Sequence, residues 1–113
     1  MRCKELKSVN LNVRGLNDQD KRCKVFQWLT DINSDVTFLQ ETFCTEKLVS
    51  NFNSNWQGVI EHAISDSPHS RGVCILFKGN NNVIVENKHA SEDGRILLLN
   101  VEIDGKNMTL INT

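Results

Sequence analysis

Residues 36–43, VTFLQETF, contain a strand-forming run that ends at a glutamate. Val36, Phe38 and Leu39 favour a β-strand with little contact to water. Burying an unpaired carboxylate costs several kcal/mol, so the side chain of Glu41 must lie at a surface turn, pair with a cation or hold a metal ion. The rest of the sequence bears on which of the three applies.

The chain has the size and composition of one small domain. Its 113 residues are 39% hydrophobic and 24% charged, which is ordinary for a globular protein and too apolar for a disordered one. A chain of this length buries roughly two-thirds of its unfolded surface on folding. The net charge of −1 neither requires nor excludes nucleic acid, because a local basic face can bind phosphates on a neutral protein. No apolar run approaches the length of a bilayer span, so no membrane association is expected.

The cysteines are spaced too widely for a local metal or redox motif. Cys3, Cys23, Cys44 and Cys74 form no Cys-x-x-Cys pair. The opening residues, MRCKELK, lack the apolar core of a signal peptide. We therefore expect free thiols in a reducing, intracellular compartment.

Hydrophobic periodicity predicts the element order β-α-β-α-β-β-β-β-β. The expected strands are residues 6–13, 36–40, 59–64, 72–77, 82–87, 95–103 and 106–112, and the expected helices are residues 21–32 and 46–52. Asp104-Gly105 between the last two strands is a strong hairpin signal. Early helices followed by consecutive strands favour an α+β protein or an α/β sandwich over a doubly wound parallel sheet.

Two polar side chains stand out at the ends of the first two strands. Asn10 and Asn12 lie on one face of the first strand, although asparagine is depleted in strands, and Glu41 directly follows the second. Taken singly, the asparagines indicate a wet face or a turn contact, and Glu41 indicates a surface residue. Taken together, Asn12 and Glu41 occupy the carboxyl ends of two strands that a βαβ connection can place side by side. A carboxylate beside a neutral amide suits Mg²⁺, which takes oxygen ligands and retains waters.

At this point the chain resembles a known family. LNVRGLN (residues 11–17), the helical KR pair (residues 21–22), FLQET (residues 38–42), RGVCILF (residues 71–77) and DGRILLLNVEIDGKNMTLINT (residues 93–113) occur in the order seen in the endonuclease/exonuclease/phosphatase superfamily. Within it, the sequence is most similar to the apurinic-type endonuclease domain of non-LTR retrotransposons. In that family the last strand leads into a Tyr-Ala-Pro-Asn segment. Residues 1–113 are therefore expected to be the N-terminal part of one such domain, roughly its first half.

The resemblance implies a four-layer α/β sandwich and Mg²⁺-dependent hydrolysis of a phosphodiester bond in DNA, with Mn²⁺ as the alternative ion. It implies that Asn12 arranges the phosphate and catalytic groups, and that Glu41 binds the metal, with Asn12 beside it in the same pocket. The family's tyrosine, Asp-x-Asn pair and Ser-Asp-His lie beyond Thr113. Arg14 stands where many relatives have asparagine. The implied context is a monomeric nuclease region, in the same polyprotein as a reverse transcriptase, that nicks target DNA in the nucleus. The 113 residues alone are expected to show little or no activity.

Two other functions stay open on the sequence. One is a phosphatase or phosphodiesterase of the same superfamily acting on a small phosphorylated substrate, since one fold hosts several chemistries. The other is a non-catalytic remnant that binds DNA or folds only in part, because missing strands would leave open edges and an uncovered apolar face around GVCILF and ILLLNV.

The remaining candidates for chemistry are weaker. His62, His69 and His89 are predicted to have surface or turn roles, and Lys21, Arg22 and Lys24 to form a solvated helix face. Trp28 and Trp56 are predicted to lie in the core rather than to stack on bases.

Overall fold

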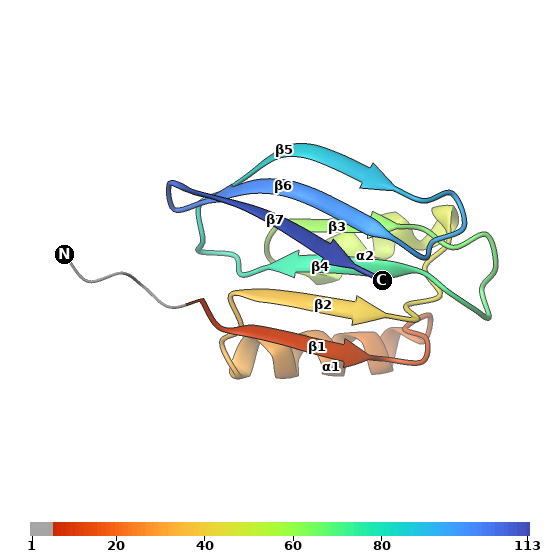
Figure 1. Cartoon of the computed structure of the whole chain (residues 1–113). Coiled ribbons are helices and arrows are strands. Elements are labelled where there is room, and N and C mark those ends of the chain that lie inside the picture. Colours follow the sequence, from red (N-terminus) through yellow and green to blue (C-terminus); the bar gives the residue numbers. More distant parts are fainter. Residues whose placement is uncertain (1–5) are drawn as a thin grey trace.

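The computed structural model describes residues 6–113, which form two β-sheets packed face to face with helices against one of them (Figure 1). Cys3 lies outside the described residues. The first sheet has the strand order β1-β2-β4-β3 and the second has the order β5-β6-β7. The strands are β1 (Ser8–Asn12), β2 (Val36–Gln40), β3 (Ile60–Ala63), β4 (Val73–Phe77), β5 (Val83–Ala90), β6 (Leu97–Ile103) and β7 (Lys106–Asn112). The helices are α1 (Gln19–Asp31), the short 3-10 helix η1 (Glu46–Leu48) and α2 (Val49–Asn55).

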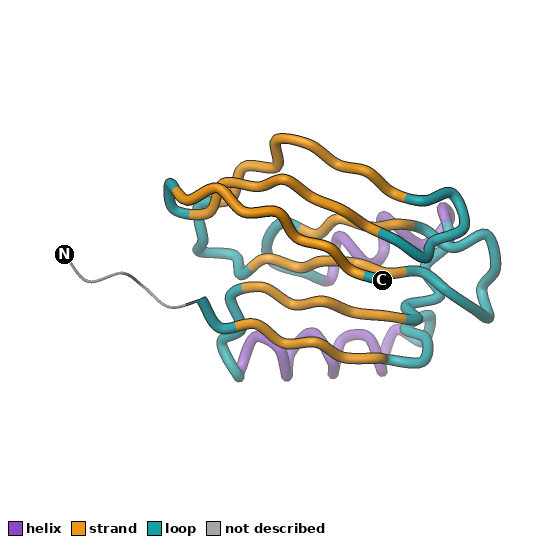
Figure 2. The backbone as a smooth tube through the Cα atoms, viewed as in Figure 1, coloured by secondary structure: helices purple, strands orange, loops and turns teal. Residues whose placement is uncertain are grey.

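The predicted α+β class and element order are confirmed. Each predicted strand and helix is present, with bounds that differ by a few residues. Both helices pack against the first sheet, and the outer face of the second sheet carries no helix within the described residues (Figure 2). The described residues therefore make three layers, helix, sheet and sheet, of the predicted four-layer sandwich.

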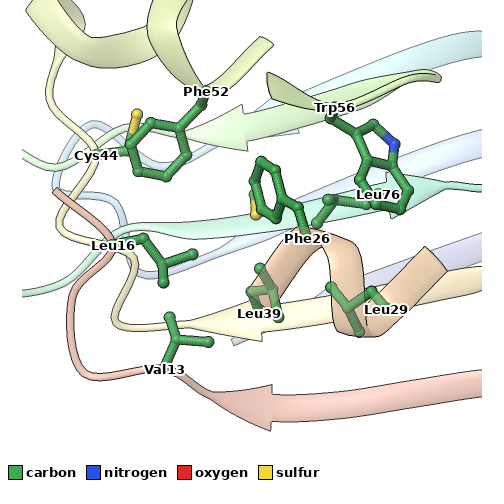
Figure 3. Packing of buried hydrophobic residues seen from close by; sticks show 10 residues of the cluster. Val13, Leu16, Phe26, Leu29, Leu39, Cys44, Phe52, Trp56 and Leu76 are labelled. Carbon is green, nitrogen blue, oxygen red and sulfur yellow. The ribbon is translucent and has the colours of Figure 1, made fainter. Parts of the chain in front are cut away.

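The core between the helices and the first sheet is built around aromatic contacts (Figure 3). The ring of Phe26 on α1 packs edge-to-face against Phe52 of α2 at 6.4 Å and against Trp56 at 5.5 Å between centroids. Trp56 is buried, as predicted, and its indole Nε1 donates to the carbonyl oxygen of Phe77 at 3.0 Å. The prediction for Trp28 is wrong, because its side chain is 48% exposed. On helix α1 it is Phe26 that faces the core instead, where it contacts Phe52 and Trp56.

The core between the two sheets explains why β4 is apolar throughout. All five of its residues are buried, because Cys74 and Leu76 face the helices while Val73, Ile75 and Phe77 face the second sheet. Strand β6 alternates instead, and its buried side chains are Leu97, Leu99, Val101 and Ile103. The expectation of an uncovered apolar face around GVCILF and ILLLNV is therefore wrong, since the two runs cover each other.

One asparagine joins the two sheets through main-chain hydrogen bonds. Asn112, at the end of β7, is 2% exposed, and its Nδ2 donates to the carbonyl oxygens of Leu39 at 3.0 Å and Cys74 at 2.8 Å. The side chain of Gln40 donates in turn to Asn112 Oδ1 at 2.7 Å. Every polar atom of the Asn112 amide group is thus used, which compensates for its burial.

The hairpin between β6 and β7 forms as predicted. Asp104 and Gly105 both adopt positive φ, at 50° and 86°, as a two-residue turn of this twist requires. The turn sets the antiparallel register in which Ile103 lies opposite Lys106 and Leu97 opposite Asn112. This register delivers Asn112 to the first sheet.

Two predicted surface side chains are in fact buried. Arg22 is 2% exposed and His62 is 6% exposed, whereas His69 and His89 are exposed as predicted. Arg22 lies at the contact between the helices because its guanidinium finds carbonyl partners there. His62 lies on the face of β3 that α2 covers. None of the helices in residues 6–113 is long and apolar enough to span a bilayer.

Candidate active site

The first two strands bring the two predicted site residues to one edge of the sheet. Strands β1 and β2 pair in parallel, with Asn12 opposite Gln40, so their carboxyl ends coincide. The amide of Val13 continues the ladder by donating to the carbonyl oxygen of Gln40 at 3.0 Å. Asn12 and Glu41 therefore leave adjacent strands at the same level.

Glu41 is turned out of the sheet by its backbone. Its φ of 54° lies in the left-handed region, which ends β2 and directs the side chain to solvent. Nδ2 of Asn12 donates a hydrogen bond to Oε2 of Glu41, and Oδ1 of Asn12 accepts one from the amide of Arg14 at 3.2 Å. Both side chains are exposed. Within the described residues, Glu41 thus occupies a surface turn and has an amide partner, which answers the question that its place after a buried strand raises.

Three loop segments are joined by main-chain hydrogen bonds beneath this pair. The amides of Gly15 and Leu16 donate to the carbonyls of Glu41 at 2.6 Å and Thr42 at 3.0 Å. The amide of Thr42 donates in turn to the carbonyl of Gly72 at 2.9 Å. The β1–α1 loop, the segment after β2 and the segment before β4 therefore form one hydrogen-bonded platform, which holds the Asn12–Glu41 pair in place.

Backbone strain is concentrated in this platform. Four of its non-glycine residues have positive φ, namely Arg14, Glu41, Phe43 and Arg71. Each such residue costs of order 1 kcal/mol or more, and strain of this kind clusters at functional sites. The clustering distinguishes this edge of the sheet from the opposite one.

The charges around the pair are of both signs. Arg14 lies two residues after Asn12 and is exposed. The Nζ atom of Lys21 donates to the carbonyl oxygen of Val13 in the β1–α1 loop at 2.7 Å. Arg71 forms an ion pair with Asp66 at 3.0 Å. Arg14 and Lys21 therefore both place positive charge near the pair, whereas the charge of Arg71 is paired.

The donor set suits a hard cation that keeps most of its waters. No three His, Cys, Asp or Glu side chains converge on one point in the described part of the chain, so a site that encloses the ion is not formed here. Mg²⁺ is commonly held by one or two carboxylates, waters and substrate phosphate oxygens. An exposed carboxylate with a fixed orientation, as Glu41 has, fits that mode of binding.

Sequence reasoning missed two side chains that shape this edge. Asn112 accepts a hydrogen bond from the side chain of Gln40, the residue before Glu41. Arg22 holds the β1–α1 loop by donating from Nη1 to the carbonyls of Leu16 at 2.9 Å and Asn17 at 3.3 Å. An asparagine at the end of the apolar run MTLIN was a usable signal for Asn112. Arg22 carried no local signal, because its partners come from other elements.

Comparison with known structures identifies the fold. No family model and no curated protein matches the sequence. Among solved structures, the two-sheet arrangement is similar to those of two endonucleases, a TDP2 and an endonuclease/exonuclease/phosphatase family protein from Bacteroides thetaiotaomicron, and this likeness shows the fold. The similarity runs over almost the whole of this chain but over half or less of each structure compared.

Three of these structures illustrate the likeness. An AP endonuclease from Leishmania major matches with a TM-score of 0.68 and 18% identity, over 96% of this chain and 39% of its own. A humanized D. rerio TDP2 with 14 mutations matches with a TM-score of 0.66 and 20% identity, over 94% of this chain and 45% of its own. The endonuclease domain of TRAS1, a telomere-specific non-LTR retrotransposon, matches with a TM-score of 0.55 and 10% identity, over 92% of this chain and 43% of its own.

Proposed function

We propose that residues 1–113 are the N-terminal part of a metal-dependent endonuclease domain that hydrolyses a phosphodiester bond in DNA. The observation that carries the proposal is the Asn12–Glu41 hydrogen bond at the shared carboxyl edge of β1 and β2. Open sheets of α/β type place ligand crevices at such an edge. The likeness to an AP endonuclease and to the TRAS1 endonuclease domain supports DNA as the substrate.

In the proposed mechanism, Glu41 would be the carboxylate ligand of Mg²⁺ or Mn²⁺, and the ion would supply positive charge to offset the charge on the scissile phosphate. The hydrogen bond from Asn12 to Oε2 holds the carboxylate in one orientation and leaves Oε1 for the ion. Asn12 remains a candidate second ligand through the free lone pair of Oδ1, whose other lone pair accepts from Arg14. The platform of main-chain hydrogen bonds keeps both groups fixed, so little reorganisation is needed when substrate arrives.

Arg14 is placed to attract the phosphate backbone. An exposed cation next to the Asn12–Glu41 pair favours approach of an anionic strand and offsets the repulsion between Glu41 and phosphate. The general base and the remaining substrate contacts are proposed to come from polypeptide beyond Thr113. Because such groups act as a unit, residues 1–113 alone should be almost inactive.

The wider setting is also proposed on the resemblance. The domain would act as a monomer, within the same polyprotein as a reverse transcriptase, and would nick target DNA in the nucleus. Reading the coding sequence downstream of Thr113 tests this setting, since it should encode the rest of the nuclease domain and then reverse-transcriptase sequence. A coding sequence that continues into unrelated protein contradicts it.

The metal role of Glu41 is tested on the chain as it stands. Titration of the ¹⁵N-labelled chain with Mn²⁺ should broaden the amide signals of residues 12–14 and 41–43 first. Glu41→Gln removes the charge at nearly constant volume and should abolish this selective broadening. Glu46→Gln, on another exposed glutamate, is the matched control and should leave it intact. Broadening at the site that persists in Glu41→Gln would refute the metal role.

Activity is tested on the chain extended by the residues encoded downstream. The extended protein should nick supercoiled plasmid in Mg²⁺, and Glu41→Gln should reduce the rate by roughly a hundredfold to a thousandfold, the scale seen when one transition-state group is removed. Asn12→Ala should also lower turnover sharply without unfolding the protein. Nicking at the parent rate by either folded variant contradicts the assignment of that residue.

A further inference from the structure

A groove runs along the free edge of β3, between α2 and the end of β5. It has a volume of about 700 Å³ and continues into a second hollow of about 680 Å³ that shares Ile64 and Glu92 with it. We call the two together the β3 groove. Its apolar walls are Leu48, Val49, Ile60, Ile64, Pro68 and Ala90. Neither Asn12 nor Glu41 lines it, so the β3 groove is distinct from the candidate active site.

The floor of the β3 groove offers main-chain groups from an edge strand. Strand β3 pairs only with β4 in its sheet. The amide of Phe77 donates to the carbonyl of Val59 at 2.8 Å, which fixes the alternation of the ladder. Glu61 and Ala63 therefore direct their backbone groups to β4, and Ile60 and His62 direct theirs to the groove. An extended chain placed here would find donors and acceptors at the spacing of a sheet.

A buried histidine in the wall of the β3 groove has an unused acceptor. The Nε2 atom of His62 lies 3.1 Å from Oδ1 of Asn53 on α2, so Nε2 carries the hydrogen and Nδ1 is left as an acceptor. Burial and the nearby Lys88 lower the pKa of His62 to about 4, so the ring is neutral at ordinary pH. Nδ1 is buried and has no hydrogen-bond partner in the described part of the chain.

The charges lining the β3 groove are mainly acidic. Four carboxylates and two lysines line it: Glu46, Glu61, Asp66, Glu92, Lys47 and Lys88. Arg71 pairs with Asp66, so the excess negative charge comes from Glu46 and Glu92 against Lys47. Lys88 pairs with Glu61 at 3.0 Å, from β5 across to β3. This ion pair lies on the side of β3 that faces the second sheet, whereas His62 and Asn53 lie on the side that faces α2. The wall toward the second sheet therefore carries the Glu61–Lys88 ion pair and Glu92, and the wall toward α2 carries Val49 and Ile60.

We propose that the β3 groove binds an extended peptide segment of a partner protein, which adds as a further strand to β3. Side chains of a strand alternate between its two faces. Aliphatic side chains of the guest would pack toward Val49 and Ile60, and lysine or arginine side chains would face Glu61 and Glu92. This interaction goes beyond the proposed nuclease function and does not depend on it.

The test uses the full 113-residue chain and the peptide acetyl-Lys-Val-Lys-Val-Lys-Val-Lys-amide. In ¹H–¹⁵N spectra at low salt, the peptide should cause saturable shifts at residues 60–64 and 88–92. Glu92→Lys should weaken binding roughly tenfold, because it reverses a charge that faces the guest, and added salt should reduce that difference. Glu86→Lys is the matched control, since Glu86 is exposed on β5 and lies outside the β3 groove, and it should bind like the parent chain.

Two backbone-modified peptides separate strand addition from simple charge attraction. Methylating either the three valine amides or the internal lysine amides removes donors from one edge of the strand only. One of the two peptides should lose binding and the other should keep it, because only one edge faces β3. Equal binding of both peptides, shifts outside the β3 groove, equal weakening by Glu86→Lys, or no saturable binding at millimolar peptide would each overturn the proposal.

Discussion

The guanidinium carbon of Arg22 lies 4.9 Å from the centre of the Phe52 ring, so that a buried cation faces an aromatic side chain between α1 and α2. The Nε atom of Arg22 also donates to Oδ1 of Asn55 at 2.8 Å, while Nη1 holds the carbonyls of the β1–α1 loop. One side chain thus connects both helices to the loop that follows Asn12. The planar fork of donors makes this possible, and a lysine could not reproduce it.

Replacing this guanidinium should destabilise the protein. Arg22→Met leaves the carbonyl oxygen of Leu16 and the side chain of Asn55 without their donors and removes the cation–π contact, so we expect a loss of about 2–3 kcal/mol in the free energy of unfolding. Urea unfolding followed by circular dichroism measures it. Lys24→Met, at an exposed position of the same helix, is the control and should change stability by less than about 0.5 kcal/mol. Equal effects of the two substitutions would mean that the Arg22 contacts are not stabilising.

Removing the amide that joins the sheets should also be costly. Asn112→Ala removes the hydrogen bonds that its amide donates to the carbonyls of Leu39 and Cys74 and the one that it accepts from Gln40, and we expect a loss of about 2–4 kcal/mol. Asn107→Ala, on an exposed position of the same strand, should be nearly neutral. A stability for Asn112→Ala within experimental error of the parent protein would show that water replaces the lost bonds without penalty.

The buried histidine predicts a pH dependence of stability. Burial and then Lys88 lower the pKa of His62 from 6.5 to about 4, so between these values the unfolded chain binds a proton that the folded chain excludes. The contribution of His62 to the free energy of unfolding is therefore fully present above pH 6.5. It is lost as the pH drops toward 4, by about 1.4 kcal/mol per pH unit at most. His62→Gln should flatten the unfolding free energy over this range relative to the parent chain. His69→Gln, on an exposed side chain, should not, and an unchanged slope in His62→Gln contradicts the prediction.

Alanine substitutions at two glycines with positive φ distinguish the cost of backbone strain from the cost of a steric clash. Gly72 has a φ of +89°, and an added Cβ would lie 2.6 Å from Oγ1 of Thr42, whereas Gly105 has a φ of +86° and nothing within 4 Å. Gly105→Ala should cost about 1 kcal/mol from backbone strain alone. Gly72→Ala should cost at least about 1 kcal/mol more, because the buried threonine beneath Glu41 must move. Thermal unfolding compares the two, and similar melting temperatures would show that the loop yields without cost.

The sequence predicted the architecture because its signals were local. Alternation of apolar residues, the Asp-Gly pair and the early helices specified the α+β order, and each of these depends on neighbouring residues. The pairing of Asn12 with Glu41 followed from a general property of parallel strands joined by a helix. Their chemical roles stay predictions, which the metal titration and the nicking assay address.

The errors share one physical origin. Residues 21–32 carry two overlapping apolar stripes, one through Trp28 and one through Phe26, and only the aromatic side chains of α2 and Trp56 decide which turns inward. In the same way, the charge of Arg22 predicts an exposed side chain, and only its carbonyl partners in the folded protein explain why it is buried. The apolar runs around Ile75 and Leu99 were each expected to be exposed, because nothing in either run shows that the other covers it.

The sequence alone thus determined which segments are strands and helices, and that Glu41 follows a strand too apolar to shelter a bare carboxylate. The tertiary structure decided which polar groups are buried and which partners satisfy them, including Arg22, His62 and Asn112. The reason is that secondary structure depends mainly on residues within one or two turns of the chain. The loss of hydration on burying a polar group is compensated only when distant segments supply its hydrogen bonds, and those segments meet only in the folded protein.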